Sequence, residues 1–473
     1  MIKKYYRITF ELVSPLSIGC GENNLTDSDL IRDSRGIPYI PGTALAGVYR
    51  QLFSKTSAEA YFGPDLTQER ILLAAETGKN PLWESEVRVY DAYMINPGKR
   101  VLGKRDMVAL DEYKTAVEGA KFDFEILEPG AVFVTYIEQT MEREDQQYVC
   151  DELAFAWICG EIQLGAKTGR GYGYTRGLQA DAATFHLDVP DELEKWLDFD
   201  MYKGPDSKGD SLCKSAGTPF CLSGLNPENP EYVRISEVYR RENIFRDRKN
   251  CRRLTLTLRQ KGGISIRQYS TDVGDADYKQ LTRKWDAHSG KTADPEGVPV
   301  IPGTSWAGAF RAQIANLDPD FGKNRPLASL FFGRAKERGV DSSRSRIAFS
   351  ESAFSGGTWI TYTRNAIDRF TGGTVDGALY TEKTYYNGST ELEISCDFTG
   401  LETKDTERFA RIMAAAVLDL HNGYLSVGGL TAAGRGIFRI EKLMIDGKAF
   451  SLPENGEKVY EELADAISGK EEG

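Results

Sequence analysis

The feature that most constrains this chain is an internal duplication. Residues 36–53 read "GIPYIPGTALAGVYRQLF", and residues 297–314 read "GVPVIPGTSWAGAFRAQI". When 37–50 is aligned with 298–311, eight of the fourteen positions are identical. A repeat that covers much of a chain decides the fold, so it has to be recognised before any single motif is interpreted.

Further matches occur in the same order in both halves. Alternating, strand-like runs end in "SPLSIG" and "GGISIR", and "AYFG" is later matched by "LFFG". Each half closes with a helical pattern followed by a glycine-rich segment, "LGAKTGRGYGYTRG" or "VGGLTAAGRGIFRI". The order strand, loop, helix, strands, helix, glycine-rich loop and strand predicts an α+β chain. We expect two tandem ferredoxin-like domains with hairpin insertions.

The sequence predicts a first domain at residues 1–189 and a second domain at 251–450. A partly ordered linker joins them at 190–250, and an acidic tail with a short helix follows at 451–473. The first helix of each domain is expected to begin at Thr43 or Thr304, because a hydroxyl residue after Pro-Gly is a good N-cap. The second helices are expected at 152–163 and 406–421.

Composition limits the functions that this chain can have. The 473 residues are 41% hydrophobic and 27% charged, and no apolar run is long enough to span a membrane. The first residues lack the pattern of a signal peptide, so we expect a cytoplasmic protein. The net charge of −11 argues against non-specific coating of nucleic acid, although it leaves room for a local basic groove. Seven scattered cysteines without a CxxC pair indicate neither a disulfide framework nor a zinc site.

The glycine-rich segments are the better ligand candidates. Glycines let a backbone approach a polyanion closely, while Lys167 and Arg170 supply charge and Tyr172 a face for stacking. A dinucleotide-binding loop would follow a strand and open a helix, whereas these segments follow a helix and precede a strand. For either glycine-rich segment, the alternative to a ligand-binding role is a simple tight turn. With an arginine between glycines in both segments, we predict RNA-backbone binding by Gly165, Lys167, Gly169, Arg170, Gly171, Tyr172, Gly173, Gly428, Gly429, Gly434, Arg435 and Gly436.

The duplicated helix starts are a weaker candidate for anion binding. The first N–H groups of a helix can bind a phosphate, and the hydroxyl of Thr43 or Thr304 could contribute to that site. Arg50 and Arg311 lie two turns further on and could reach a neighbouring phosphate. The alternative is that Pro-Gly-Thr only starts a helix, and that the small residues of this helix allow it to pack closely on the sheet.

The paired "IPGT-x-x-AG-x-x-R" helix starts, the "G-x-x-x-x-GRG-x-G" segment and the "A-[LI]-D" inserts resemble the RAMP superfamily of CRISPR-associated proteins. The likeness spans about residues 5–180 and 252–445. It is closer to the backbone subunits of type III effector complexes, here two fused in one chain as in type III-D-like systems. The resemblance implies RRM-like domains along a CRISPR guide RNA and, in many members, Mg²⁺- or Mn²⁺-dependent cleavage of the paired target RNA. It implies as partners both RNAs, a large polymerase-like subunit and further RAMP subunits, and no membrane.

The resemblance also places catalytic residues. In the family, the catalytic aspartate lies in the loop between the first strand and the Pro-Gly helix start. In "GENNLTDSDLIRD" the matching residue is Asp27, with Asp29 as the alternative. In "YSTDVGDADYKQL" we favour Asp277 over Asp275. Asp27 and Asp277 would also bind the metal, although loop aspartates are more often solvated turn residues.

The inserts that contain "VALDEY" and "NAIDRF" resemble the family's thumb, a hairpin that pushes between bases of the guide–target duplex. Its wedge would be Met107 and Val108 in the first half, with Asn365 and Ala366 nearest to it in the second. An ordinary surface hairpin is the alternative.

Three functions are compatible with these observations. The leading hypothesis is a two-module type III backbone subunit that holds guide RNA and cleaves target RNA. The alternatives are a non-catalytic guide-RNA-binding scaffold of the same complex and a guide-RNA processing endoribonuclease. The chain has only three histidines and no acyl-transfer triad pattern, and the processing enzymes often use a histidine base.

Overall fold

The structure is a computed structural model of the whole chain. It describes residues 1–19, 28–65, 67–77, 83–97, 102–110, 116–142, 149–158, 160–202, 221–222, 250–269, 276–283, 285–286, 291–292, 297–317, 330–334, 343–452 and 457–469.

The chain forms two compact units that do not divide it at a single point. The first unit comprises Met1–Lys104, Phe124–Ala166 and Gly173–Asp247. The second comprises Arg105–Asp123, Lys167–Tyr172 and Arg248–Gly473. Two short segments of the first repeat, a hairpin end and part of its glycine-rich segment, therefore belong to the second unit.

The first unit is built on a mainly antiparallel sheet. Its strands run in the order β2-β4-β7-β1-β8-β9, and β3 pairs with β7. The central strand β1 is antiparallel to both β7 and β8. The bounds are β1 Ile2–Leu12, β2 Tyr39–Ile40, β3 Val87–Val89, β4 Ala92–Met94, β7 Val132–Met141, β8 Thr175–His186 and β9 Cys221–Leu222.

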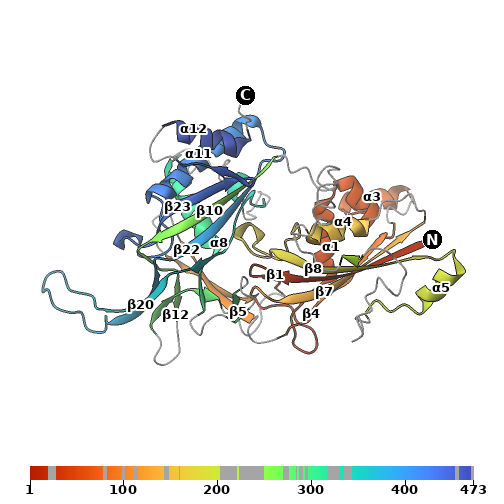
Figure 1. Cartoon of the computed structure of the whole chain (residues 1–473), viewed down its shortest axis with the longest axis horizontal. Coiled ribbons are helices and arrows are strands. Elements are labelled where there is room, and N and C mark those ends of the chain that lie inside the picture. Colours follow the sequence, from red (N-terminus) through yellow and green to blue (C-terminus); the bar gives the residue numbers. More distant parts are fainter. Residues whose placement is uncertain are drawn as a thin grey trace. The chain divides into compact units, whose positions relative to one another are not determined.

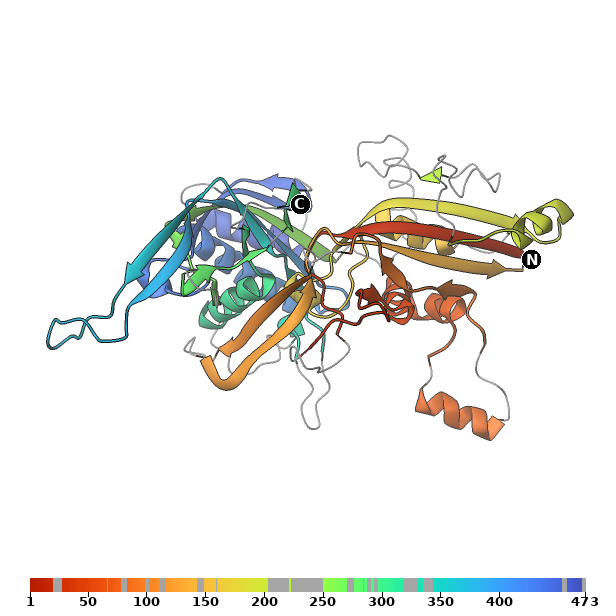
Figure 2. The ribbon, with the colours of Figure 1, turned by 90° about the horizontal axis from the view of Figure 1, so that it is seen from below.

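Helices cover one face of this sheet (Figure 1). They are α1 Gly42–Leu52 and α4 Val149–Ile158, with α2 Lys55–Phe62 beside α1. Helix α3 Gln68–Thr77 is largely exposed and extends away from the sheet (Figure 2). Because side chains alternate along a strand, Tyr6, Ile8 and Phe10 of β1 all point into this core. The Tyr6 hydroxyl donates to Asp151 Oδ1 of α4 at 2.7 Å. The core therefore lies between β1 and the helix pair α1 and α4.

The opposite face of the first sheet is also covered. Tyr5, the neighbour of Tyr6, points to that face and accepts a 3.0 Å hydrogen bond from the indole N–H of Trp196. Trp196 belongs to α5 (Pro190–Leu197), and Phe185 and Phe199 pack beside the Tyr5 ring. The segment predicted as a linker thus begins with a helix that packs on the first unit.

The second unit has a larger sheet of similar design. The strand order is β14-β17-β19-β22-β10-β23-β24, with β18 paired to β22. The bounds are β10 Cys251–Lys261, β14 Thr282–Arg283, β17 Val298–Ile301, β18 Ile347–Phe349, β19 Ser352–Ser355, β22 Ser389–Asp397, β23 Ile437–Ile445 and β24 Lys448–Phe450. Alternate β10 side chains, among them Leu254 and Leu256, are fully buried beneath the helices.

Three helices complete this core, α8 Gly303–Leu317, α11 Thr403–Asn422 and α12 Glu457–Ser468. Leu463 and Ile467 of α12 are fully buried in it. The acidic C-terminal segment therefore contributes a helix to the second unit.

A second small sheet in this unit carries a long hairpin. Its order is β11-β21-β13-β12, and β20 pairs with β21. The bounds are β11 Gly263–Ile264, β12 Arg267–Tyr269, β13 Tyr278–Gln280, β20 Thr358–Arg364 and β21 Tyr380–Tyr386. The loop that joins β20 to β21 extends beyond the sheet (Figure 2). Two further hairpins are β5–β6 (Leu102–Leu110 and Ala116–Leu127) and β15–β16 (Trp285–Asp286 and Lys291–Thr292).

The α+β class is confirmed, with small differences in the helices. Helices α1 and α8 begin at Gly42 and Gly303, one residue before the predicted threonines. Helix α4 ends at Ile158 rather than at residue 163; the nearby Gly160 has a φ of +67°, which does not continue a right-handed helix. Over the described residues, no helix combines the length and apolarity that crossing a bilayer would require.

Candidate functional site

Hydrogen bonds align the two glycine-rich turns residue by residue. Ala166 N–H donates to Ser17 O at 2.9 Å, and Gly429 N–H donates to Ser265 O at 2.7 Å. Each turn then contains one short 3-10 helix, η2 (Thr168–Arg170) or η3 (Thr431–Ala433). Arg170 therefore corresponds to Ala433, and Tyr172 corresponds to Arg435.

The last glycine of each turn is required by the fold itself. Gly173 and Gly436 have φ values of +81° and +71°. A Cβ atom would lie 1.8 Å from the Leu164 carbonyl oxygen in the first case and 1.9 Å from that of Val427 in the second. No other residue fits at either position.

The charged and aromatic side chains of the turns differ from the prediction. Arg170 is exposed, whereas Lys167 is half-buried. Burial lowers the pKa of Lys167, and the positive charge of Arg170 lowers it further. Tyr172 is 2% exposed, so its ring offers no stacking face in this conformation. Arg435, 3% exposed, forms a buried ion pair with Glu382 and donates to Thr384 Oγ1 at 3.1 Å. The two arginines are therefore not equivalent, and RNA binding by the turns stays a prediction.

The start of α1 already has an anionic partner from the protein. Gly42 N–H donates to Asp91 Oδ1 at 2.7 Å, while Thr43 is exposed. Arg50 donates to the carbonyl oxygens of Phe62 and Gly63 at 3.2 and 2.8 Å and pairs with Asp65. In this conformation a carboxylate takes the position that the sequence suggested for a phosphate, and Arg50 fixes the chain after α2.

The start of α8 is more enclosed. A Cβ on Gly303 would lie 2.2 Å from Phe349 O, and Thr304 is half-buried. Arg311 is exposed on the helix, with its guanidinium 6.0 Å from the centre of the Phe332 ring. Phosphate binding by Thr304 and Arg311 stays a prediction.

Strand register relates the candidate aspartates of the two repeats. Gly19 bridges Leu30, and the corresponding pair in the second repeat is Arg267 with Gln280. Asp27 and Asp277 both lie three residues before the second member of their pair, so they occupy equivalent positions. Asp29 corresponds to Lys279 and is only 6% exposed. Asp27 and Asp275 lie outside the described residues.

Asp277 is the candidate acid that the structure describes on the surface. It is exposed immediately before β13, and its Oδ2 accepts a 2.7 Å hydrogen bond from the backbone N–H of Thr381. The parallel pairing of β13 with β21 places Tyr278 beside Glu382 and thereby holds these two chain segments together. The backbone therefore fixes the orientation of the Asp277 carboxylate.

Next to Asp277 lies a group of aromatic and basic side chains that sequence reasoning missed. The Arg267 guanidinium is 4.9 Å from the centre of the Tyr278 ring, and that ring packs edge-on against Tyr380 at 5.7 Å. On the neighbouring strand, Arg364 lies 5.4 Å from the centre of the Tyr362 ring. The strand pairings place all five residues on one side of the sheet. We call them the tyrosine–arginine face.

No sequence motif indicates this face, because its residues come from four strands that only the sheet brings together. The alternation of polar and aromatic residues in "TWITYTR" and "YTEKTYY" is the signal that could have been used. Arg267 is exposed, whereas Arg364 is half-buried and its Nε lies 4.0 Å from Glu382 Oε2. Arginines beside aromatic rings suit a polyanion that also carries stackable bases.

The donor set near Asp277 is too small for a metal site made by protein alone. Among the residues that the structure describes, no group of three or more His, Cys, Asp or Glu side chains could hold a metal ion. Mg²⁺ is commonly bound through one or two carboxylates together with water and substrate phosphates. Asp277 fits a Mg²⁺ or Mn²⁺ ion of that kind, shared with a bound phosphate.

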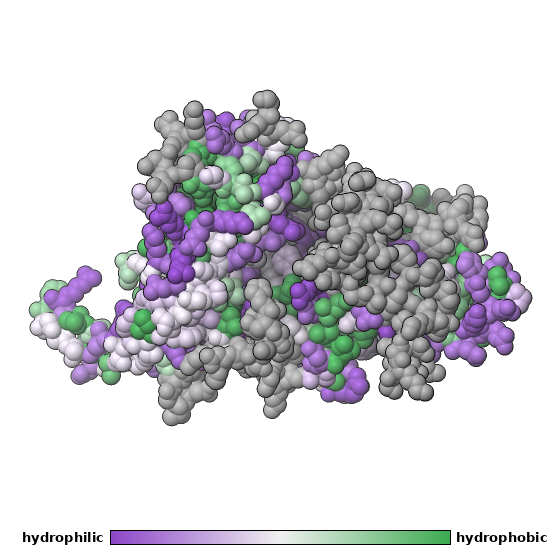
Figure 3. All heavy atoms as spheres, in the orientation of Figure 1, coloured by the Kyte–Doolittle hydropathy of each residue, from purple (hydrophilic) through white to green (hydrophobic). Residues whose placement is uncertain are grey.

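The hairpin between β20 and β21 carries apolar side chains at its end. Asn365 and Ala366, the predicted wedge, are exposed, but Ile367 and Phe370 are larger and are 65% and 98% exposed. The space-filling view shows apolar residues among polar ones on this extension (Figure 3). Asp368 Oδ1 accepts from the N–H groups of Phe370 and Thr371 at 3.0 and 2.7 Å, and the Thr371 backbone bond is the largest cause of its lowered pKa. In the first repeat, Met107 is half-buried and Val108 exposed.

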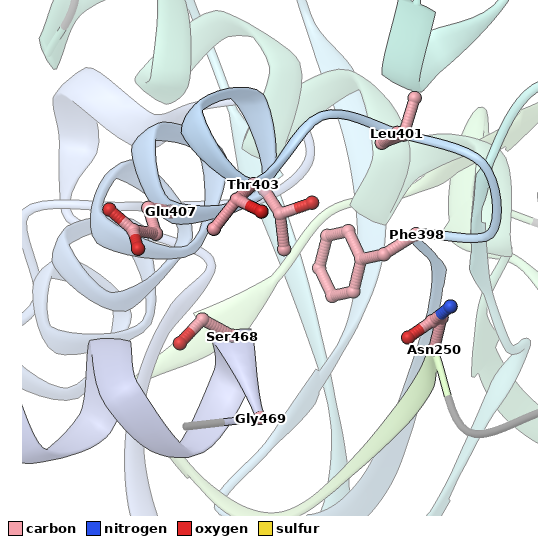
Figure 4. Close-up of a pocket in the computed structure, with 8 residues that line it drawn as sticks. Asn250, Phe398, Leu401, Thr403, Glu407, Ser468 and Gly469 are labelled. Carbon is pink, nitrogen blue, oxygen red and sulfur yellow. The ribbon is translucent and has the colours of Figure 1, made fainter.

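A pocket of about 180 Å³ lies elsewhere in the second unit (Figure 4). Thr403 and Glu407 at the start of α11 line it, together with Phe398, Leu401 and Ser468. The glycine-rich turn follows the other end of this helix, and 20 residues at 1.5 Å each place the two helix ends roughly 30 Å apart. The pocket is therefore separate from the turn.

A comparison with family models decides the family. The model of the RAMP superfamily matches residues 9–176 and 287–439, which together make up more than half of the chain. The chain belongs to the RAMP superfamily. The two matched regions contain both helix starts and most of both glycine-rich turns, which agrees with the duplication.

Other comparisons add little about this RAMP protein. No curated protein matches the chain. Among solved structures, it is similar to a chain in the cryo-EM structure of the type III-B Cmr-beta complex bound to cognate target RNA. The identity is 19% and the TM-score 0.30, and the match covers 38% of this chain and 60% of that chain. The chain thus spans less than two thirds of the structure it matches.

Proposed function

We propose that this RAMP protein is a backbone subunit of a type III CRISPR effector, in which two elaborated ferredoxin-like modules hold guide RNA and cleave the paired target. RAMP membership and the duplicated architecture support the first part of this proposal. The observation that carries it is the exposed Asp277 carboxylate, which directly precedes Tyr278 of the tyrosine–arginine face in the chain.

The face supplies the two contacts that single-stranded RNA uses most. Arg267 and Arg364 can pair with phosphates, while Tyr278, Tyr362 and Tyr380 offer rings on which bases can stack. This recognition would be largely independent of sequence, which suits a protein that must hold a guide of any sequence. It is also confined to one side of one small sheet, so it is compatible with the net charge of −11.

Cleavage is proposed at Asp277 and, by equivalence, at Asp27. A bound Mg²⁺ or Mn²⁺ would neutralise charge that develops on the scissile phosphate. Asp277 would hold the ion, and the Thr381 N–H would keep its carboxylate in a fixed orientation. A non-catalytic scaffold is the second candidate, favoured by the lack of a three-ligand cluster among the described residues.

The binding part of the proposal is tested on Arg267. Arg267→Ala is expected to weaken binding of a guide-length RNA to the full chain at least about fivefold and to reduce the salt dependence by about one phosphate contact. Filter binding at several salt concentrations measures both. Arg259→Ala is the matched control, an exposed arginine of β10 that donates to Ser389. Equal effects of the two substitutions would refute the assignment of the face.

The hairpin end is proposed as the base wedge of the second module, with Phe370 and Ile367 in place of Asn365 and Ala366. Phe370→Ala is expected to leave the thermal unfolding midpoint unchanged, because the ring is 98% exposed. Stacking on an aromatic ring contributes about 1–3 kcal/mol per base. Without the Phe370 ring, the target base that it would displace should therefore stay mostly stacked on its neighbours. Fluorescence of 2-aminopurine placed at successive positions of the paired target reports this. An unchanged profile in Phe370→Ala would contradict the wedge.

A further inference from the structure

We propose that a buried triad of charged side chains, Arg105, Glu351 and Arg283, positions the hairpin β5–β6 within the second unit. The inference rests on the proposed function, because this hairpin carries Met107 and Val108, the predicted wedge of the first repeat. The three charged residues are positioning residues, since they would act on the RNA only through the hairpin.

The hairpin has little backbone pairing to hold it in place. Its end, Arg105–Asp123, belongs to the second unit together with Arg248–Gly473. Apart from one bridge between Leu16 and Leu127 at its base, its described strands form a sheet of only two. A two-stranded hairpin is marginally stable by itself in water, so side-chain contacts have to fix its position. The second hairpin differs, because β21 also pairs with β11 and β13.

The triad joins the hairpin end to two other segments of the second unit. Arg105 Nη2 of β5 lies 4.0 Å from Glu351 Oε2, and Arg283 Nη1 of β14 lies 3.6 Å from Glu351 Oε1. The side chains of Arg105, Glu351 and Arg283 are 5%, 4% and 7% exposed, so none of them offers a surface to RNA in this conformation. Arg105 and Met107 are two residues apart on one strand and point to the same side of the hairpin. A contact that fixes Arg105 therefore acts on the nearest wedge residue of that side.

The carboxylate of the triad occupies a position that has another task in the first repeat. Glu351 and Asp91 are equivalent, because each lies two residues after β18 or β3 and directly before β19 or β4. Asp91 Oδ1 accepts from Gly42 N–H at 2.7 Å, at the start of α1. Glu351 is one methylene longer, and its carboxylate reaches two arginines. The same position thus serves a helix start in the first repeat and the hairpin contact in the second.

The geometry of the triad favours a role in position over a role in stability. Removing charges from water costs free energy that an ion pair returns only with close, well-aligned contacts. Here two arginines share one carboxylate, at separations longer than those of charge-assisted hydrogen bonds. Replacing such a triad by apolar side chains of similar volume is often neutral or stabilising. What apolar side chains lack is a directional attraction that selects one position of the hairpin.

Arg105→Met tests the triad while leaving the other two charges paired. The variant removes the surplus positive charge, and Glu351 keeps its contact with Arg283, so the thermal unfolding midpoint should stay at the parent value. In the full chain without RNA, amide hydrogen exchange in β5 should become at least about tenfold faster, while exchange in β10 stays at the parent rate. Lys104→Met is the matched control, because it makes the same change at the neighbouring, exposed side chain.

The effect on RNA is read in the assembled complex with guide and target RNA. Fluorescence of 2-aminopurine at successive target positions reports which bases leave the stack, and Phe370→Ala identifies the position that belongs to the second hairpin. We expect Arg105→Met to lower the signal of the first hairpin at least about threefold and to leave that of the second unchanged. Lys104→Met should keep the parent profile. Arg105→Lys, which retains the charge, should recover at least half of the lost signal.

A triple variant separates position from stability. Arg105→Met/Arg283→Met/Glu351→Leu is expected to unfold in urea at or above the parent midpoint, because no buried charge remains. Its signal at the position of the first hairpin should nevertheless be as low as that of Arg105→Met. A triple variant that unstacks this base as the parent does would show that apolar packing is sufficient and would overturn the proposal.

The remaining outcomes are also decisive. An unchanged base profile in Arg105→Met would overturn the proposal, and so would equal losses at both hairpin positions, which indicate general destabilisation. If the parent complex unstacks no target base, the proposed wedges fail, and exchange without RNA decides the present inference separately. Faster exchange confined to the hairpin of Arg105→Met would then support the triad, whereas unchanged exchange would refute it.

Discussion

Replacing Asp277 by asparagine is expected to reduce target-RNA cleavage at one of the proposed sites at least about a hundredfold, while guide-RNA binding stays within twofold. A carboxylate that works in a proton transfer or on a metal contributes at least that factor. Asparagine keeps an oxygen that can accept the Thr381 N–H, so the loop geometry is preserved and the lost property is the negative charge. Cleavage of an end-labelled target by the assembled complex in Mg²⁺ measures the effect site by site.

Asp376→Asn provides the matched control, because Asp376 is an exposed aspartate in the loop after β20 of the same unit. Asp27→Asn should remove a different cleavage product, and the double variant should remove both. If the Asp277→Asn complex cleaves its target at the parent rate, the catalytic assignment fails. Loss of binding together with cleavage would instead show that Asp277 supports the fold of the face.

The duplication was sufficient to predict the α+β class and the position of both helix starts, because the same apolar spacing and the same Pro-Gly signal occur twice. The start of α4 was misplaced by three residues, because helix ends are the least certain part of a helix to place. The sequence could not show that α5 packs on the first sheet. Its contact through Trp196 and Tyr5 joins residues 191 positions apart, and no local pattern encodes such a contact.

Residues of the candidate site could be proposed from the sequence only where a local motif indicates them. Asp277 was proposed because its loop resembles a family pattern, and its catalytic role stays a prediction. The tyrosine–arginine face was missed because Arg267 and Arg364 are brought together by pairing of distant strands. The burial of Arg435 was not predicted, because a glycine-flanked arginine is usually exposed. The structure shows that its guanidinium pairs with the buried Glu382 carboxylate.

The buried pair of Arg435 and Glu382 should be the most stability-sensitive feature of the second turn. Breaking a buried ion pair by removing one partner costs about 3–5 kcal/mol, because the other charge remains buried without compensation. Glu382→Leu is expected to lower the free energy of unfolding by about that amount. Arg435→Met is expected to cost less, because Arg364 Nε remains 4.0 Å from Glu382 Oε2. Urea unfolding of the full chain measures the loss, and hydrogen exchange in β21 and the turn locates it in the second unit.

The first repeat indicates how the pair can be replaced. By strand register Glu382 corresponds to Phe124 and Arg435 to Tyr172, and both aromatic residues are buried. The double variant Glu382→Phe/Arg435→Tyr is therefore expected to recover at least about half of the stability lost in either single variant, since replacing a whole buried pair by apolar groups is often neutral. Additive losses in this double-mutant cycle would show that the two side chains stabilise the turn independently. Recovery would show that Glu382 and Arg435 act as a pair, and that aromatic side chains can replace that pair in the second unit.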